Sequence, residues 1–174
     1  MIRDSVALAW YGTPVGQRVA NANQSDQYAI SQWVENGARP QLSAERKQLI
    51  HQLDRIVMGS DNTLRLAVDA GVAIGYSMMT AMGIPVTEEQ VREMTQAQVL
   101  AEGAELVSKY QATLAYTYES LSDSDLREYI VFMLQPESTI LSDALWNGIS
   151  NAVATAGASM GSMLAEELQA GFEL

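Results

Sequence analysis

The feature that most constrains the fold is a short hinge that occurs twice, with an offset of 122 residues. In each copy an apolar run carries an aromatic residue four positions before a proline, Trp10 before Pro14 and Phe132 before Pro136. The same offset aligns further apolar positions, Leu8 with Ile130 and Val19 with Leu141. Proline cannot continue a helix that arrives from before it but is tolerated in a helix's first turn. The repeat therefore predicts two helix–turn–helix corners.

The first corner, near residues 8–20, has a residue type suited to each step of the turn. Trp10 and Tyr11 supply an aromatic anchor. Gly12 is expected to end the first helix in the left-handed conformation. Pro14 then starts the next helix, where its missing N–H leaves no hydrogen bond unmade. We interpret this segment as a structural hinge.

The second corner, near residues 130–142, repeats the pattern with Phe132 and Pro136. Ser138 stands where the first copy has Gly16. This difference raises the alternative of one kinked, continuous helix in place of a clean turn.

The rest of the chain shows helical rather than alternating spacing of apolar residues, punctuated by glycine and proline. No segment carries a hairpin signal. A length of 174 residues is enough to bury a core. We predict an all-α bundle of about seven to eight helices that forms a single domain over residues 1–174, with a degenerate internal repeat.

Three segments carry helix-start signals. Ser43 is a predicted N-cap, and Thr87 with Gln90 and Ser122 with Asp125 form predicted capping boxes. We expect the Asp123-x-Asp125 pattern to cap a helix, because the rest of a calcium loop is missing. The sequence from Gly59 to Asn62 is expected to break the chain between two helices.

Two helices carry glycine pairs at Gly-x-x-x-Gly spacing, Gly71 with Gly75 and Gly157 with Gly161. A glycine exposed on a helix costs about 1 kcal/mol relative to alanine. The simplest explanation of such pairs is therefore that they let a second helix pack closely. We expect each pair to pack against a neighbouring helix. A ligand cavity and a dimer contact remain alternatives for these faces.

The cavity alternative uses methionines near the glycine pairs, namely Met78, Met79, Met82 and Met160. Flexible thioether side chains suit an irregular apolar cavity. This hypothesis predicts a carrier of an apolar small molecule or lipid.

Charge excludes several classes of partner. The net charge of -11 and the lack of a basic stripe argue against nucleic-acid binding. The longest basic cluster, Arg46-Lys47 with Arg39 and Arg55 nearby, is expected to be a solvated helix face. The apolar run from Ala70 to Val86 is short and holds polar residues, so we predict a buried helix and no transmembrane segment.

The sequence offers no catalytic constellation. It has no cysteine, and its single histidine, His51, is expected to face water, so we predict no metal site and no cofactor. Acidic residues on one long helix, Glu89, Glu93, Glu102 and Glu105, are expected to be solvated. A carboxylate-dependent hydrolase stays an alternative only if these acids converge in a cleft.

The first hinge, Leu8 to Gln17, resembles the aliphatic–aromatic–aromatic–x–Ser/Thr–Pro–x–Gly hinge of the bacterial domain-of-unknown-function family two thousand and fifty-nine. The segment from Leu121 to Leu126, followed by Phe132 and Pro136, resembles the same family's lead-in and hinge, apart from Ser138. The resemblance implies an all-helical bacterial protein, usually exported to the periplasm, with no assigned activity. It carries over no catalytic residue.

Under the 122-residue offset, Met1 aligns with Asp123, where the second copy's lead-in helix is expected to open. We therefore expect a native segment with an export signal upstream of residue 1. Our hypothesis is a non-enzymatic helical module of the bacterial cell envelope, periplasmic or secreted, with a structural or protein-interaction role. Its partner is an unidentified protein or a second copy of the chain.

Overall fold

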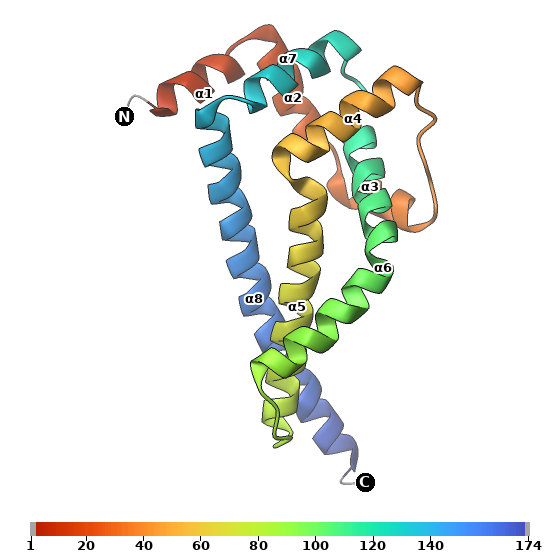
Figure 1. The fold of residues 1–174 in the computed structure, drawn as a ribbon, viewed down its shortest axis with the longest axis vertical. Helices are drawn as coiled ribbons and strands as arrows, with labels where there is room; N and C mark the ends of the chain where they lie inside the picture. The colour runs from red at the N-terminus through yellow and green to blue at the C-terminus, as the bar shows by residue number, and fades with distance from the viewer. Residues whose placement is uncertain (1–2, 173–174) are drawn as a thin grey trace. The chain divides into compact units, whose positions relative to one another are not determined.

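The computed structural model describes residues 3–172, and this part of the chain is all-α (Figure 1). Its eight helices are α1 (Arg3–Tyr11), α2 (Pro14–Asn23), α3 (Gln27–Glu35), α4 (Ala44–Val57), α5 (Gly59–Ala81), α6 (Glu88–Thr117), α7 (Asp123–Met133) and α8 (Pro136–Phe172). No strand occurs between residues 3 and 172. The prediction of an all-α fold with seven to eight helices is confirmed.

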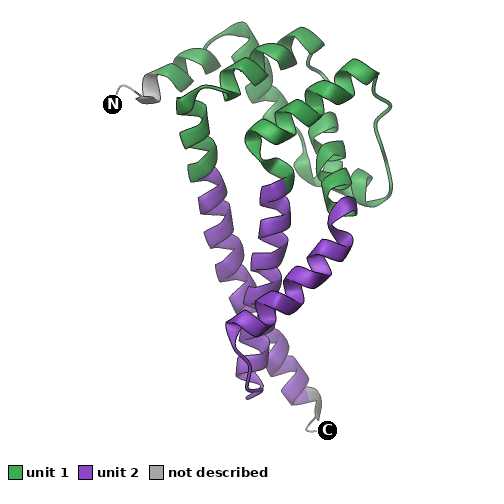
Figure 2. Cartoon of the chain, viewed as in Figure 1, with its two compact units in different colours: residues 1–60, 105–144 green, residues 61–104, 145–174 purple. Residues whose placement is uncertain are grey.

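The helices form two compact units (Figure 2). Unit 1 contains the residues up to 60 together with 105–144, and unit 2 contains 61–104 together with those from 145 onward. Three helices, α5, α6 and α8, run from one unit into the other. The single domain over residues 1–174 stays a prediction.

The predicted caps form. The Ser43 hydroxyl accepts a hydrogen bond from the Arg46 amide at 3.1 Å and starts α4. Ser122 and Asp125 make a reciprocal capping box at the start of α7. Thr87 and Gln90 do the same before α6: the Gln90 amide donates to the Thr87 hydroxyl at 3.2 Å, and the Thr87 amide donates to Gln90 Oε1 at 2.9 Å. The capping interpretation of Asp123-x-Asp125 is confirmed.

The predicted break from Gly59 to Asn62 is wrong, because α5 begins at Gly59. The turn between α4 and α5 is a single residue, Met58, in the left-handed conformation with φ 48°. Gly59 is instead needed for close packing: a Cβ there would overlap the ring of Tyr110 on α6. Gly59 therefore serves close packing within α5, and the residue with positive φ is Met58.

Unit 1 has a core of aliphatic and aromatic side chains. Helix α7 packs against both α4 and α2, and α1 packs against α2. The fully buried members of this core are Val19, Ala22, Leu49, Ile50, Leu53, Ala115, Tyr118, Leu121, Leu126, Tyr129, Ile130 and Phe132. Ile30, Val34 and Ala112 form a smaller cluster between α3 and α6. The two clusters fix α4, α6 and α7 around one another.

Unit 2 consists of α5, the first part of α6 and most of α8. Its buried apolar residues are few and small, namely Val72, Val91 and Ala165. Within residues 3–172, no helix combines the length and apolar character that crossing a membrane requires, including α5, which contains most of the run from Ala70 to Val86.

Candidate functional site

The two predicted corners lie against each other in unit 1. The rings of Trp10 and Phe132 stack with centroids 4.0 Å apart and planes within 7°. Tyr11 meets the Phe132 ring edge-on at 5.8 Å, and Tyr129 lies beside Trp10 at 5.7 Å. The aromatic anchors of the two hinges therefore form one cluster. This cluster is a packing element and presents no reactive group.

The corners share their helix boundaries and one closing hydrogen bond. Helices α1 and α7 end at Tyr11 and Met133, positions 122 residues apart, and the next helices begin at Pro14 and Pro136 with the same offset. The Gly12 amide donates to the Leu8 carbonyl at 3.1 Å, and the Leu134 amide makes the equivalent bond to Ile130 at 3.1 Å. The alternative of a kinked continuous helix in the second corner is wrong.

Gly12 does not adopt the predicted left-handed conformation. Among the described residues, the glycines with positive φ are Gly37 and Gly83. A helix-terminal hydrogen bond closes the end of α1, and the Thr13 hydroxyl donates to the Trp10 carbonyl at 2.7 Å. A turn closed this way needs no residue with positive φ.

The difference between Gly16 and Ser138 has a structural explanation. A Cβ at Gly16 would overlap the carbonyl oxygen of Trp10, so the backbones touch there. At the equivalent place the buried Ser138 hydroxyl donates to the Phe132 carbonyl at 2.9 Å. One corner is closed by the absence of a side chain and the other by a hydrogen bond.

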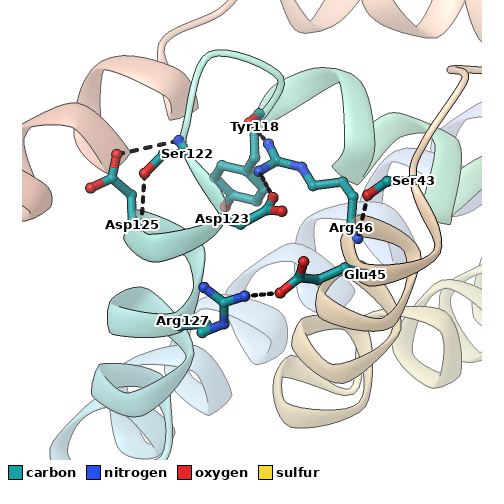
Figure 3. A network of polar contacts seen from close by, with 8 residues as sticks. All are labelled: Ser43, Glu45, Arg46, Tyr118, Ser122, Asp123, Asp125 and Arg127. Carbon is teal, nitrogen blue, oxygen red and sulfur yellow. Dashed lines mark hydrogen bonds and ion pairs between the residues drawn. The ribbon is translucent and has the colours of Figure 1, made fainter.

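A polar network joins α4 to the start of α7 (Figure 3). Arg46 is buried, and its guanidinium donates to the Asp123 carboxylate at 2.8 Å and to the Tyr118 carbonyl at 2.5 Å. Nearby, Arg127 forms an ion pair with Glu45. The prediction of a solvated face is wrong for Arg46, because its guanidinium donates hydrogen bonds to two groups outside α4. The other three basic residues of the cluster are exposed.

A second buried polar group was not predicted. Asp54 is buried and accepts hydrogen bonds from the Ser60 amide at 2.8 Å, the Ser60 hydroxyl at 2.6 Å and the Gln111 side chain at 2.9 Å. These bonds tie the short α4–α5 turn to α6. Three structural hydrogen bonds satisfy this carboxylate, so it is not a candidate catalytic acid or base.

Burial raises the pKa of four tyrosines in unit 1, Tyr11 among them. The pKa of Tyr118 rises to about 12 because burial penalises the phenolate, although its hydroxyl donates to Asn23 at 2.8 Å. Burial also raises the pKa of Tyr129, and nearby tyrosines add to the effect. For Tyr110 burial acts first, followed by the charge of Asp54. These hydroxyls stay protonated at neutral pH.

The predicted glycine pairs are contact points within unit 2. A Cβ at Gly161 would overlap the Ile74 carbonyl of α5, and one at Gly157 would lie 3.0 Å from the Ala73 Cβ. The α5 glycines face α6: a Cβ at Gly71 would lie 2.5 Å from Thr95, and one at Gly75 would lie 3.1 Å from the side chain of Val91. Helix α5 is thus packed closely on two sides.

The methionines of the cavity hypothesis differ in exposure. Met78 and Met79 are half-buried on α5 and Met82 is half-buried in the turn that follows it, whereas Met160 on α8 is 51% exposed. None of these four side chains lines the hollows beside α4 and α6 or those beside α5. The carrier hypothesis stays a prediction.

The acidic residues of α6 and the histidine lie on the surface. Glu89, Glu93, Glu102 and Glu105 are exposed, and Glu105 pairs with Lys109 at 3.1 Å. The expectation that His51 faces water is confirmed. Between residues 3 and 172, no group of three or more acidic or histidine side chains is arranged to hold a metal ion.

The feature that remains is the outer stripe of α8, which we define as Leu145, Ile149, Ala152, Ala156, Met160 and Met163. All six residues are exposed, and Leu145 and Met163 reach 62% and 65%. Their spacing of three or four residues places them on one face of the helix. From Ala144 to Ala165 the helix carries no charged residue.

Comparison with known proteins gives no relative: no protein-family model matches the chain, and neither a curated protein nor a solved structure is detectably similar to it.

Proposed function

We propose that the protein is a non-catalytic helical module that binds another protein through the outer stripe of α8. The observation that carries the proposal is the stretch of 22 residues from Ala144 to Ala165 that lacks any charge yet has an exposed apolar face. A helix that is apolar on opposite faces is normally covered on both. One face of α8 packs on α5 through Gly157 and Gly161, which leaves the stripe for a partner.

The stripe has the dimensions of a helix-binding surface. Leu145 and Met163 are 18 residues apart, which is roughly 27 Å along a helix. Large side chains stand at both ends, and Ala152 and Ala156 stand in the middle, where a partner helix can approach closely. Exposed apolar surface of this kind is typical of protein-interaction sites.

Charge favours a basic partner over a second copy. Unit 2 contains nine acidic and two basic residues, a net charge of -7. Two such surfaces repel at ordinary ionic strength, whereas a basic helix is attracted and its own apolar face can cover the stripe. The proposed partner is therefore a protein that presents a basic amphipathic helix.

Site-specific photo-crosslinking in cells of the source organism tests this proposal. A photoreactive amino acid is placed at Ala156, on the stripe, and in a matched variant at Asn151, an exposed position of the same helix away from the stripe. We expect one protein with a basic helix to be trapped at Ala156 and absent at Asn151. The same products from both positions, or only a crosslinked dimer of this chain, would contradict the proposal.

We extend the proposal to the bacterial cell envelope as the location. The support is the resemblance of the Leu8–Gln17 hinge to an exported family, together with the net acidic surface that aids solubility. Fractionation of source cells, with antibody detection of the native protein, tests it. Recovery in the cytoplasmic fraction would rule out the location and leave the crosslinking result unaffected.

A further inference from the structure

A small hollow in unit 1 has a composition unlike the rest of this acidic chain. It lies between the loop after α3, helix α4 and helix α6, and its volume is about 260 Å³. Its floor is apolar and includes Leu42, Ile50 and Ala112. Three side chains that can carry positive charge, Arg39, Lys47 and His51, also line it. No carboxylate lines the hollow, although acidic residues outnumber basic ones 21 to 10 in the whole chain.

The two permanent cations of the hollow lack acidic partners. Among the described residues, five other cations, Arg18, Arg46, Arg92, Lys109 and Arg127, form ion pairs. Arg39 and Lys47 form none within that part of the chain, and neither do Arg55 and Arg65, which lie outside the hollow. In a protein with excess acid, cations left without a carboxylate in a concave site point to an anionic ligand.

Arg39 is held in place for such a role. Its Nη1 donates to the Val34 carbonyl at 3.0 Å and to the Ala38 carbonyl at 2.8 Å, which anchors the guanidinium on the loop. A guanidinium has five N–H donors, so those on Nε and Nη2 remain for a ligand. A planar pair of donors suits the two oxygens of a carboxylate, sulfonate or phosphate.

The opposite wall is a regular helix face. Lys47, Ile50 and His51 recur at helical spacing on α4, so one apolar and two polar side chains face the hollow together. Ser108 and Gln111 add polar groups from α6. The Gln111 amide also donates to buried Asp54, which fixes that side of the wall.

The size sets the ligand class. A volume of about 260 Å³ is slightly below the range of ordinary small-molecule pockets, which excludes a two-chain lipid body. A second cleft of about 530 Å³ shares Arg39, Pro40, Leu42 and Ala115 with the hollow, but Glu119 and Asp123 also line it, so it does not suit an apolar tail or an anionic head group. We propose that the hollow binds a small amphipathic anion, with one anionic head group at Arg39 and Lys47 and a short apolar body over Leu42 and Ile50.

Octanoate serves as the probe, and nuclear magnetic resonance of ¹⁵N-labelled full-length protein is the readout. We expect octanoate to shift the amide signals of residues that line the hollow and octanol to bind at least about tenfold more weakly, because a charged hydrogen bond contributes strongly to affinity. Equal binding of the two compounds, or octanoate shifts confined to α8, would overturn the proposal.

A matched pair of variants on α4 separates the site from overall charge. Lys47→Glu reverses a charge in the hollow, and Arg55→Glu makes the same change on the exposed surface of the same helix outside it. We expect Lys47→Glu to weaken octanoate binding about tenfold or more and Arg55→Glu to leave it within about twofold. Equal weakening by both variants would mean that only net charge matters, and the proposal would fail.

Two further arms identify the source of the head group. Hexyl phosphate tests a free phosphate ester, and vesicles of phosphatidylglycerol, compared with phosphatidylcholine, test a lipid head group. The hollow's size predicts that hexyl phosphate competes with octanoate and that phosphatidylglycerol vesicles do not. Competition by the anionic vesicles alone would contradict the assignment of a small free ligand.

Discussion

The two units are built from the same element and stabilised in different ways. Unit 1 depends on large and directional groups: the stacked rings of Trp10 and Phe132, and the buried charges of Arg46 and Asp54 with their partners. Unit 2 depends on missing side chains, since backbones approach at Gly157 and Gly161. Unit 1 should therefore be sensitive to lost atoms and unit 2 to added ones.

Tryptophan fluorescence can follow each unit separately. Trp10 and Trp33 belong to unit 1, and Trp146 belongs to unit 2. A variant that keeps only Trp146 reports on unit 2, and one in which Trp146 is replaced by phenylalanine reports on unit 1. Urea unfolding of both shows whether a substitution affects one unit or the whole chain.

The largest effect is expected from Phe132→Ala in unit 1. Phe132 is 4% exposed and stacks on Trp10, so truncation leaves a cavity between the corners. The free energy of unfolding should fall by about 3–5 kcal/mol, measured by urea unfolding with the unit 1 reporter. Val131→Ala removes an exposed neighbour and is the control. An equally small loss for both would show that the corner cluster contributes little.

The next effect is expected in unit 2, from Gly161→Ala. The added Cβ overlaps the Ile74 carbonyl, so α5 and α8 must separate, at a cost of about 3 kcal/mol. Gly148→Ala on the same helix meets nothing within 4 Å and should stabilise by about 0.5–1 kcal/mol. Opposite shifts in thermal melting temperature would support the contrast. A gain in both variants would remove the basis for close packing.

A third prediction concerns alkaline pH and unit 1. Burial raises the pKa of Tyr118 from 10.0 to about 12 in the folded protein. Its contribution to stability is fully present below pH 10 and is lost as the pH rises from there to about 12, because the unfolded phenol ionises first. The loss at pH 11.5 relative to pH 9 should be about 2 kcal/mol from this residue.

Urea unfolding at these two pH values checks the sign. Tyr118→Phe should reduce the alkaline loss, and Tyr28→Phe, at a site 75% exposed, is the control. If the wild type is as stable at pH 11.5 as at pH 9, or if both variants behave alike, the buried phenol is not the cause.

The smallest effect is expected from Ser138→Gly, which tests both modes of stabilisation inside unit 1. It removes the hydroxyl that donates to Phe132 and should cost about 1 kcal/mol. Ser138→Ala keeps the Cβ and separates the hydrogen bond from backbone freedom. Calorimetric melting of both variants gives the comparison. No loss in either variant would show that the second corner needs no polar closure.

Local sequence signals predicted much of the fold. Helical spacing gave the all-α class, and the pattern around Ser122 and Asp125 gave a helix start that the structure confirms. The prolines correctly predicted the positions of both corners, because Pro14 and Pro136 each begin a helix. These features depend on neighbours in sequence, which is why a single chain reveals them.

Features that depend on distant segments were missed. Arg46 read as a surface residue because its partners, Asp123 and the Tyr118 carbonyl, lie more than 70 positions away. The sequence suggested that Gly59 would end α4, but Gly59 packs against Tyr110, a residue 51 positions away, and the residue with positive φ is Met58. The α8 stripe had one usable signal, the absence of charge from Ala144 to Ala165, but periodicity alone did not show which apolar face is covered.

The stacking of Trp10 on Phe132 also constrains when the protein can fold. The two rings belong to segments 122 residues apart, so this contact cannot form until residue 132 has been synthesised. At roughly 5–20 residues per second, α1 waits on the order of 6–25 s for its partner. During that interval the ring of Trp10, which Phe132 covers in the folded chain, is open to a chaperone. The nascent chain therefore has a built-in period of dependence on other proteins that the finished fold does not reveal.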